Sequence, residues 1–392
     1  MASIQKRGAN SYTLRVELGY DTEGNRVRKL KTIKGNFGKR ELEKELAKFV
    51  AEVESGQYIS LDKMTFEYFI TEWRTKFVER NLEAKTIVNY LYHVNKRILP
   101  HFGKLRMDKI KTMHIVDYLE KLHDQERIIG KGKLSSATIV YNYRVLRSIF
   151  SKAVDWKVIK ENPIKGVTKP KEKSKEMDVY NDEEVKFVIG ALANEKQLFR
   201  ILILLAITTG LRCGELLGLE WKHIDLEHAF IEVKQSIPMF KDGQPIIKEP
   251  KTKNSIRKVS VPQFVIDELR AFQLQCKKDR LKLEEKWEGG ERFFVFCNWN
   301  GKPFYTKTPS DMWRRFIKKY PQMKYIRFHD LRHTSATLLI NQGVHAKIIS
   351  NRLGHSNIGT TMNVYGHAIE SADKAAASKF DSFFEVKQQK QL

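Results

Sequence analysis

Residues 328–365 bring together side chains whose types suit the cleavage of a phosphodiester. His329 and Arg332 are three positions apart, so on a helix both side chains point the same way and reach one phosphate. His355 follows a glycine that would end an apolar helix, which holds this histidine at the helix terminus. Ten positions later Tyr365 offers a hydroxyl nucleophile. The segment therefore predicts a phosphoryl-transfer site.

The same segment admits a rival interpretation as a metal site. The run from His329 to His333 resembles the zinc motif HExxH with Asp330 in place of glutamate, and histidines at i and i+4 share one helical face. Arg332, however, would bring a permanent cation close to the metal, and aspartate is a shorter base than glutamate. These two features favour the phosphate interpretation, in which His333 is a structural neighbour. A zinc hydrolase stays open as the weaker alternative.

Two cations upstream complete the set that phosphodiester cleavage requires. Arg212 follows the turn-forming Gly210 between two leucine-rich segments, and its planar fork suits two phosphate oxygens. Glu215, three residues later, is a candidate ion-pair partner for this arginine. Lys251 lies in a basic turn, where a flexible stem could deliver a proton to a leaving group. Alone, a lysine-rich turn is a weak signal.

These residues need a mixed scaffold over residues 178–392. Strands are predicted at 230–233, 245–248 and 257–261, with the last two forming a hairpin around the Lys251 turn. Helices are predicted to begin near Asn181, to cover 198–208 and 262–286, and to return beyond Pro309. Together with the helices upstream, this pattern predicts an α+β chain that is mostly α.

The charge balance points to a polyanionic partner. The chain has 392 residues with 71 Lys+Arg against 47 Asp+Glu, a formal net charge of +24, which favours double-stranded DNA through phosphate contacts. Its length predicts two or three domains. Three widely spaced cysteines, no apolar leader and no long apolar run lead us to expect a cytoplasmic protein without membrane spans.

Residues 1–60 predict a small basic sheet followed by a helix. A first strand of alternating apolar residues starts at Tyr12, and a hairpin turn at 21–25 leads to a second strand at 26–31. A third short strand is expected to include Thr32 and Ile33, before a helix over 39–55. The first 40 residues hold 10 Lys+Arg and 3 Asp+Glu. A basic sheet can enter a DNA groove. The residues we expect to contact DNA here are Arg15, Arg26, Arg28, Lys29 and Lys31.

Residues 65–165 predict a helical bundle. Apolar stripes at helical spacing cover 66–78, 84–99, 114–123 and 137–158, and Ser135 stands in capping position before the last helix. Residues 166–177 are polar, charged and aperiodic, as expected of a linker. From the outward cations of the bundle we select Lys85, Arg144 and Arg147 as expected DNA contacts.

The motifs taken together resemble one known family. TGLRCGEL, HDLRH, LGHS and a tyrosine ten residues after the last histidine are similar to the signature of tyrosine recombinases, or phage integrases, over about residues 175–370. The basic sheet, the helical bundle and the linker also resemble the arm-binding and core-binding parts of integrases from phages and conjugative transposons. The resemblance thus extends over nearly the whole chain.

The resemblance implies a role for each site residue. Tyr365 would attack a scissile phosphate, leaving a 3′-phosphotyrosine and a free 5′-hydroxyl. Arg212 and Arg332 would bind the nonbridging oxygens and stabilise the transition state. The cations would replace a metal and the phosphotyrosine would conserve bond energy, so the resemblance implies no cofactor and no metal.

The remaining assignments follow in the same way. His329 would act as proton acceptor or hydrogen-bond donor, and His355 would complete the oxyanion cradle. Lys251 would protonate the 5′ oxygen, since it matches the hairpin lysine of the family better than Lys253 does. Glu215 would orient groups of the site instead of reacting.

The implied reaction needs an assembly. Four protomers would join two duplexes at core-type and arm-type attachment sites, with an excisionase or a host DNA-bending protein as accessory partners. The apolar residues at 375–384 would dock on a neighbouring protomer or on their own domain. Two alternatives remain open: a type IB topoisomerase, which would use the same residues to relax DNA, and a noncatalytic DNA-binding protein.

Overall fold

The computed structural model describes residues 2–20, 26–54, 64–128, 130–172, 178–249, 256–355, 357–359 and 362. Within the chain, Met1–Ser174 and Lys175–Leu392 are two compact units, and we treat each by itself. Several predicted features lie wholly or partly outside the described residues. They are the turn at 21–25, the linker at 173–177, the basic turn with Lys251 and Lys253, the nucleophile candidate Tyr365 and the apolar C-terminal segment.

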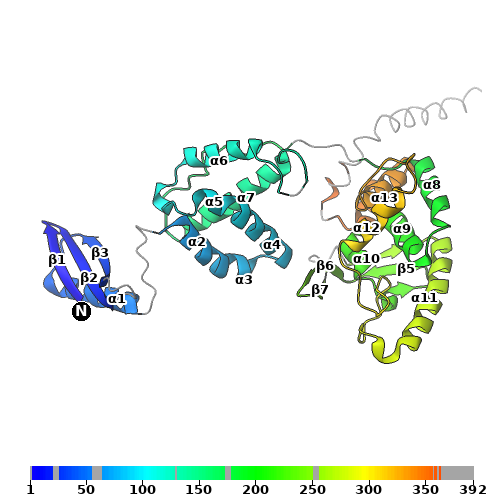
Figure 1. The fold of residues 1–392 in the computed structure, drawn as a ribbon, viewed down its shortest axis with the longest axis horizontal. Coiled ribbons are helices and arrows are strands. Elements are labelled where there is room, and N and C mark those ends of the chain that lie inside the picture. Colours follow the sequence, from blue (N-terminus) through cyan, green and yellow to red (C-terminus); the bar gives the residue numbers. More distant parts are fainter. Residues whose placement is uncertain are drawn as a thin grey trace, which may run out of the picture. The chain divides into compact units, whose positions relative to one another are not determined.

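The N-terminal part is a three-stranded antiparallel sheet covered on one face by a helix (Figure 1). The strands are β1 (Ala2–Gly8), β2 (Ser11–Tyr20) and β3 (Arg26–Lys34), and the helix is α1 (Lys39–Glu54). Its core joins Leu14 and Val16 of β2 to Phe49 and Val53 of α1.

The third strand was predicted in the wrong place. Thr32 and Ile33 continue β3 instead of forming a separate strand, and the missing strand is β1 at the start of the chain. β1 escaped prediction because Ile4 is its one large apolar residue, so its sequence has no alternation to detect.

The following helical part is built around aromatic residues. Trp73 stacks on Tyr90 with ring centroids 6.1 Å apart, and Phe66 packs against Phe102 and Phe150. The predicted helices are present, two of them with a π-helical turn, and Ser135 caps the last one by accepting from Thr138 N. In order they are α2 (Phe66–Trp73), a π turn (Arg74–Val78), α3 (Glu79–Asn81), α4 (Ala84–His93), a π turn (Val94–Ile98), α5 (Leu99–Phe102), α6 (Thr112–Asp124) and α7 (Ser136–Asp155).

The C-terminal unit is organised around one buried helix, α9. All residues from Ile201 to Ile207 are buried, and α11 and α13 both pack on this helix. A capping box between Asn181 and Glu184 starts the unit's first helix, as predicted. The helices are α8 (Asp182–Leu192), α9 (Gln197–Thr209), α10 (Cys213–Leu217), α11 (Gln263–Leu283), α12 (Thr308–Ile317), α13 (Asp330–Asn341) and α14 (Ala346–Leu353).

The strands of this unit form two separate sheets. β4 (Ile224–Asp225), β5 (Phe230–Val233) and β8 (Arg257–Ser260) make one sheet, and β6 (Ser236–Lys241) pairs with β7 (Gln244–Lys248) in the other. The prediction that 245–248 and 257–261 form a hairpin was therefore wrong. Asp242 and Gly243, both at positive φ, make the turn of the real β6–β7 hairpin.

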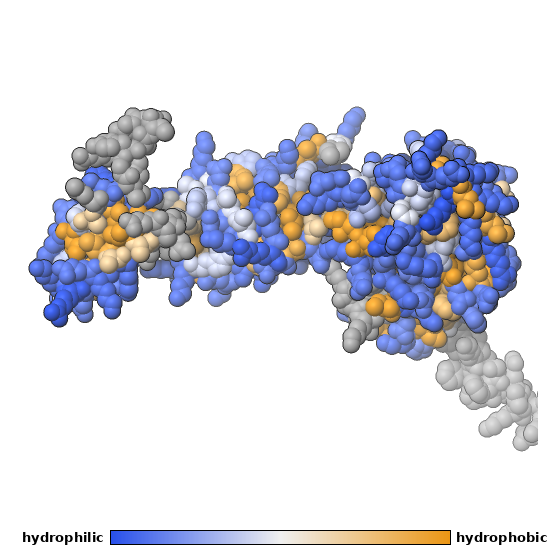
Figure 2. All heavy atoms as spheres, turned by 90° about the horizontal axis from the view of Figure 1, so that it is seen from below, coloured by the Kyte–Doolittle hydropathy of each residue, from blue (hydrophilic) through white to orange (hydrophobic). Residues whose placement is uncertain are grey.

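The class is the predicted one, α+β and mostly α. Hydrophilic residues cover much of the face seen in Figure 2, and hydrophobic residues form separate patches between them. None of the helices in the described part of the chain is both long enough and apolar enough to cross a membrane.

Candidate active site

The site begins at the tight turn between α9 and α10. Gly210 ends α9 in the left-handed conformation, at φ 64°. This conformation favours glycine, and a Cβ here would lie 2.3 Å from Cδ2 of the buried Leu353, so a larger residue would have to displace that side chain of α14. The turn places Arg212 at the N-cap of α10.

Arg212 and Glu215 form one unit. The Arg212 backbone N–H donates to Glu215 Oε2 at 2.9 Å, and Arg212 Nη1 donates to Glu215 Oε1 at 2.8 Å. The Glu215 side chain is only 6% exposed, whereas that of Arg212 is 40% exposed. The buried carboxylate therefore holds an arginine whose side chain is still accessible to solvent. A ligand in solution can reach this arginine.

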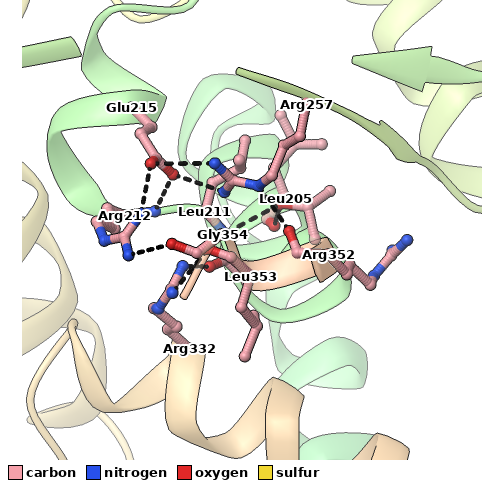
Figure 3. Close-up of polar contacts among 11 residues, drawn as sticks. Leu205, Leu211, Arg212, Glu215, Arg257, Arg332, Arg352, Leu353 and Gly354 are labelled. Carbon is pink, nitrogen blue, oxygen red and sulfur yellow. Dashed lines mark hydrogen bonds and ion pairs between the residues drawn. The ribbon is translucent and has the colours of Figure 1, made fainter. Parts of the chain in front are cut away.

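A second arginine, which sequence reasoning missed, binds the same carboxylate (Figure 3). Arg257 donates from Nη1 to Glu215 Oε1 at 3.2 Å and from Nη2 to Oε2 at 2.9 Å, and its side chain is 7% exposed. Burial alone would raise the pKa of Glu215, but Arg257 and Arg212 outweigh burial and hold that pKa below its usual value. One signal was available, because Arg257 alternates in phase with Val259 of β8 and with Val261 just after the strand, and both valines are buried.

The C-terminal end of α14 gathers three guanidinium groups around the site (Figure 3). The last carbonyls of a helix have no partner within it and form the negative end of its dipole. Gly354 ends this helix in the left-handed conformation, at φ 68°, which confirms its predicted capping position. Three consecutive carbonyls each accept from a different arginine: Arg352 O from Arg257 Nε (2.7 Å), Leu353 O from Arg332 Nη2 (2.7 Å) and Gly354 O from Arg212 Nη2 (2.8 Å).

Arg332 joins the two halves of the site. It stands on α13, is 4% exposed, and donates from Nη1 to Gly210 O at 2.6 Å. Burial and the charge of Arg212 lower the pKa of Arg332 to about 9, so the guanidinium keeps its charge at neutral pH. Two arginines far apart in the sequence thus face the same helix terminus.

His329 and His333 lie side by side at the start of α13, with ring centroids 5.3 Å apart in an edge-to-face arrangement. Loss of water around the ring and the charges of His333 and Arg332 lower the pKa of His329 to about 4. His329 is therefore neutral at neutral pH, and its ring can accept a proton.

The zinc interpretation finds little support at these histidines. Asp330, the residue in the place of the catalytic glutamate, is 4% exposed and accepts three bonds from Arg327, through its backbone N–H, Nε and Nη2. Among the described residues, no group of three histidine, cysteine or acidic side chains is arranged to hold a metal ion.

His355 follows the α14 cap and donates its backbone N–H to Ser350 O at 3.0 Å. Burial and the charges of Arg332 and Arg212 lower its pKa to about 4. It lines a small open pocket with Ser350, Asn351 and Gly354. The structure thus gathers Arg212, Glu215, Arg332 and His355 at one place, with His329 three residues before Arg332.

The sheet residues expected to contact DNA divide between two faces. Residues that pair directly across two strands share a face of the sheet. Lys31 pairs with the buried Leu14, and Lys29 pairs with the buried Val16. Both lysines therefore lie on the face that α1 covers. Lys31 Nζ lies 5.7 Å from the centre of the Phe49 ring of α1.

The opposite face of the sheet is the one that α1 does not cover. Arg15 pairs with the exposed Leu30 there, and Arg28 pairs with Glu17 on the same side. Arg26 belongs to β3, but its side chain lies outside the described residues. In the helical part, the expected DNA contacts Lys85 on α4 and Arg144 and Arg147 on α7 are all exposed.

Comparison with known proteins identifies the family. The pattern of the phage integrase family matches residues 179–371, and that of the N-terminal SAM-like domain of phage integrases matches residues 65–123. The ICEBs1 integrase of Bacillus subtilis (strain 168) is 32% identical, with 97% of this chain and 99% of the relative covered. A XerC-like tyrosine recombinase of Caldanaerobacter subterraneus subsp. tengcongensis is 30% identical, with 97% and 98% covered.

Solved structures share the fold. The Tn1549 transposon integrase in complex with a circular intermediate DNA has a TM-score of 0.65 and 22% identity, with 81% of this chain and 100% of that chain covered. A lambda integrase tetramer bound to a Holliday junction has a TM-score of 0.55 and 19% identity, with 92% and 94% covered. The chain belongs to the phage integrase family of tyrosine recombinases and is a site-specific recombinase that cuts and rejoins DNA.

Proposed function

We propose that this integrase cleaves each strand through Tyr365, with the scissile phosphate bound between Arg212 and Arg332. The observation that carries the proposal is the convergence of both guanidinium groups on the C-terminal end of α14, next to His355. Charged donors fixed in advance at one place are what an in-line phosphoryl transfer requires, because negative charge builds up on the nonbridging oxygens.

The reaction balances in protons and bonds. Tyr365 Oη forms a bond to phosphorus while the bond from phosphorus to the 5′ oxygen breaks, which leaves a 3′-phosphotyrosine. His329, neutral at neutral pH, accepts the tyrosine proton, and Lys251 gives a proton to the departing 5′ oxygen. Rejoining reverses these steps, with a 5′-hydroxyl attacking the phosphotyrosine.

Two further residues prepare the site for this step. His355 donates a hydrogen bond to a nonbridging oxygen from its neutral ring, because burial and the nearby charges of Arg332 and Arg212 keep its pKa low. Glu215 holds Arg212 in place through its side chain and its backbone N–H together. Tyr365 and Lys251 enter this proposal from their sequence positions, since both lie outside the described residues.

We further propose a division of labour along the chain. Residues 1–60 bind arm-type DNA, 65–165 bind core-type DNA, 166–177 form the linker and 178–392 catalyse. Arg15 and Arg28 on the sheet face away from α1 support the first assignment, and the match of a SAM-like integrase domain to residues 65–123 supports the second.

The relatives support an assembly as well. The lambda integrase has been solved as a tetramer on a Holliday junction, and by analogy four protomers of this chain act together on two duplexes. We propose that the enzyme integrates and excises a phage or conjugative element in the bacterial cytoplasm, with an excisionase or a DNA-bending protein setting the direction. The ICEBs1 integrase, identical at 32% of positions, supports the mobile-element role.

A suicide-substrate experiment tests the mechanism. A library of nicked duplexes, from which the cleaved 5′ end diffuses away, is incubated with the full chain, and DNA covalently bound to protein is recovered and sequenced. We expect the wild type to select a core sequence and the folded Tyr365→Phe variant to trap nothing. Adducts on the Phe variant, or none on the wild type, would refute the proposal. Closed-circle relaxation without strand exchange between two sites would instead favour a topoisomerase.

A further inference from the structure

The environment of Glu215 poses an electrostatic problem that the phosphate-binding arginines alone do not solve. A carboxylate with 6% of its side chain exposed bonds directly to Arg212, the cation assigned to the phosphate. With no other partner, Glu215 would cancel the charge of Arg212 and compete with the phosphate for its donors. The site as proposed so far would then present little more than the charge of Arg332.

Arg257 supplies the missing charge. Its guanidinium covers both oxygens of Glu215, at 3.2 and 2.9 Å, from a side chain that is 7% exposed. Two guanidinium groups bond to this carboxylate, and with Arg332 the cluster holds three cations against one anion, so a net positive charge remains for the phosphate. Arg212, 40% exposed, is the member that reaches outward.

Arg257 also fixes the position of the helix terminus. Its Nε donates to Arg352 O at 2.7 Å, so a single planar group connects β8 to α10 through Glu215 and to the end of α14. The adjacent carbonyls of Leu353 and Gly354 hold Arg332 and Arg212. A shift of Arg257 would therefore move the acceptors of both phosphate-binding arginines.

We propose that Arg257 is a positioning residue for strand cleavage: it neutralises Glu215, so that Arg212 keeps its charge for the phosphate, and it sets the α14 terminus against which Arg212 and Arg332 are aligned. The proposal rests on the phosphate-binding role of Arg212 and Arg332. It requires an arginine because only a planar fork with a third donor can bind two carboxylate oxygens and a carbonyl together.

The experiment uses the full chain and the nicked core duplex that the wild type selects from the library. The single-turnover rate of adduct formation at saturating DNA is measured separately from the dissociation constant. We expect Arg257→Gln to slow cleavage about 10²- to 10³-fold, similar to the loss of one oxyanion donor, while the dissociation constant changes less than about threefold. Arg257→Lys should slow cleavage about tenfold, because lysine keeps the positive charge and lacks the planar guanidinium that binds both carboxylate oxygens.

A double variant separates neutralisation from simple packing. Arg257→Gln combined with Glu215→Gln restores the net charge of the cluster, so it should cleave at least about tenfold faster than Arg257→Gln alone. If removing the carboxylate gives no recovery, or if Arg257→Gln cleaves at the wild-type rate, the proposal is wrong. If Arg257→Gln does not unfold cooperatively, it is not folded and Arg257→Lys takes its place in the test. A wild-type cleavage rate for Arg257→Lys would then contradict the proposal.

A matched control comes from the same unit. Arg200 on α9 donates from Nη2 to Glu268 Oε2 of α11 at 2.7 Å, a partly buried ion pair that has no contact with the phosphate-binding residues. Arg200→Gln should lower the unfolding temperature and leave the cleavage rate unchanged. A wild-type protein that forms no adduct would overturn the proposed mechanism itself, whereas a wild-type rate in Arg257→Gln would overturn only the role of Arg257.

Discussion

Arg212 donates from Nη2 to the carbonyl of Gly354 at 2.8 Å, across 142 positions of sequence. This bond ties the N-cap of α10 to the C-terminal end of α14. It places the assigned phosphate ligand one residue from His355. The geometry of the α14 terminus, on which this hydrogen bond depends, can be tested by substitution.

Gly354→Ala should damage the site more than Gly343→Ala. Both glycines have positive φ, 68° and 74°, so each alanine is strained by about 1–2 kcal/mol. A Cβ at 354 would lie 2.8 Å from the Arg257 guanidinium, whereas a Cβ at 343 meets nothing within 4 Å. We expect both variants to lose stability in thermal unfolding and only Gly354→Ala to lose adduct formation. Equal adduct rates would contradict the importance of the helix terminus.

Arg332→Lys should be a severe change despite the retained charge. Arg332 spans Gly210 O and Leu353 O with two nitrogens, and a lysine can reach only one of these acceptors. We expect adduct formation to fall about 10²-fold or more and unfolding to become easier by about 1–3 kcal/mol, because a buried carbonyl loses its donor. Urea titration measures the second effect. Unchanged stability would show that the Gly210 and Leu353 carbonyls do not need the Arg332 guanidinium as their hydrogen-bond donor.

The pH dependence of stability should report His355. Its pKa in the folded protein, about 4, is below that of an unfolded histidine, so the unfolded chain binds more protons. The free energy of unfolding must therefore fall as pH drops from about 6.5 towards 4. His355→Gln should reduce this fall by about 1–2 kcal/mol, allowing for solvent screening. Urea titrations of both proteins at pH 7 and pH 5 compare them, and parallel curves would argue against the buried neutral histidine.

DNA affinity should separate the two faces of the N-terminal sheet. Replacing Arg15 or Arg28 by glutamine should weaken binding of a labelled duplex and lower the slope of log affinity against log salt by about one each. Lys31→Gln is the control, because this lysine lies over Phe49 on the helix-covered face. A larger loss of affinity for Lys31→Gln than for Arg15→Gln would contradict the prediction that DNA binds the face with Arg15 and Arg28.

Chelation should leave cleavage intact. The zinc interpretation needs Asp330 as a base, but Arg327 occupies that carboxylate with three hydrogen bonds. We expect adduct formation to proceed at the same rate after dialysis against EDTA. A loss that zinc restores would revive the metal hydrolase.

The sequence predicted those parts of the fold whose signals are local. Apolar stripes located the helices, and Gly354 was recognised as a helix cap because a glycine after an apolar run has a specific backbone meaning. Glu215 was named as the partner of Arg212 because the two residues are three positions apart at a helix start.

The failures came where partners are distant or signals were passed over. Arg257 binds Glu215 across 42 residues, and no short motif announces such a contact. The β6–β7 hairpin had a local signal in the Asp242-Gly243 pair, which favours a tight turn, whereas the predicted hairpin relied on the basic residues at 251–255. Contacts of that range depend on how whole elements pack, which a single sequence does not specify.

Without DNA, the carbonyls at the end of α14 occupy donors of the two arginines that we assign to the scissile phosphate. Each arginine that we assign to the phosphate already donates to a backbone oxygen, at 2.7 Å from Arg332 and 2.8 Å from Arg212. Under the proposed mechanism, an incoming DNA phosphate meets guanidinium groups that already have acceptors. Any phosphate that binds there, free or within DNA, must therefore compete with these backbone oxygens for the guanidinium donors.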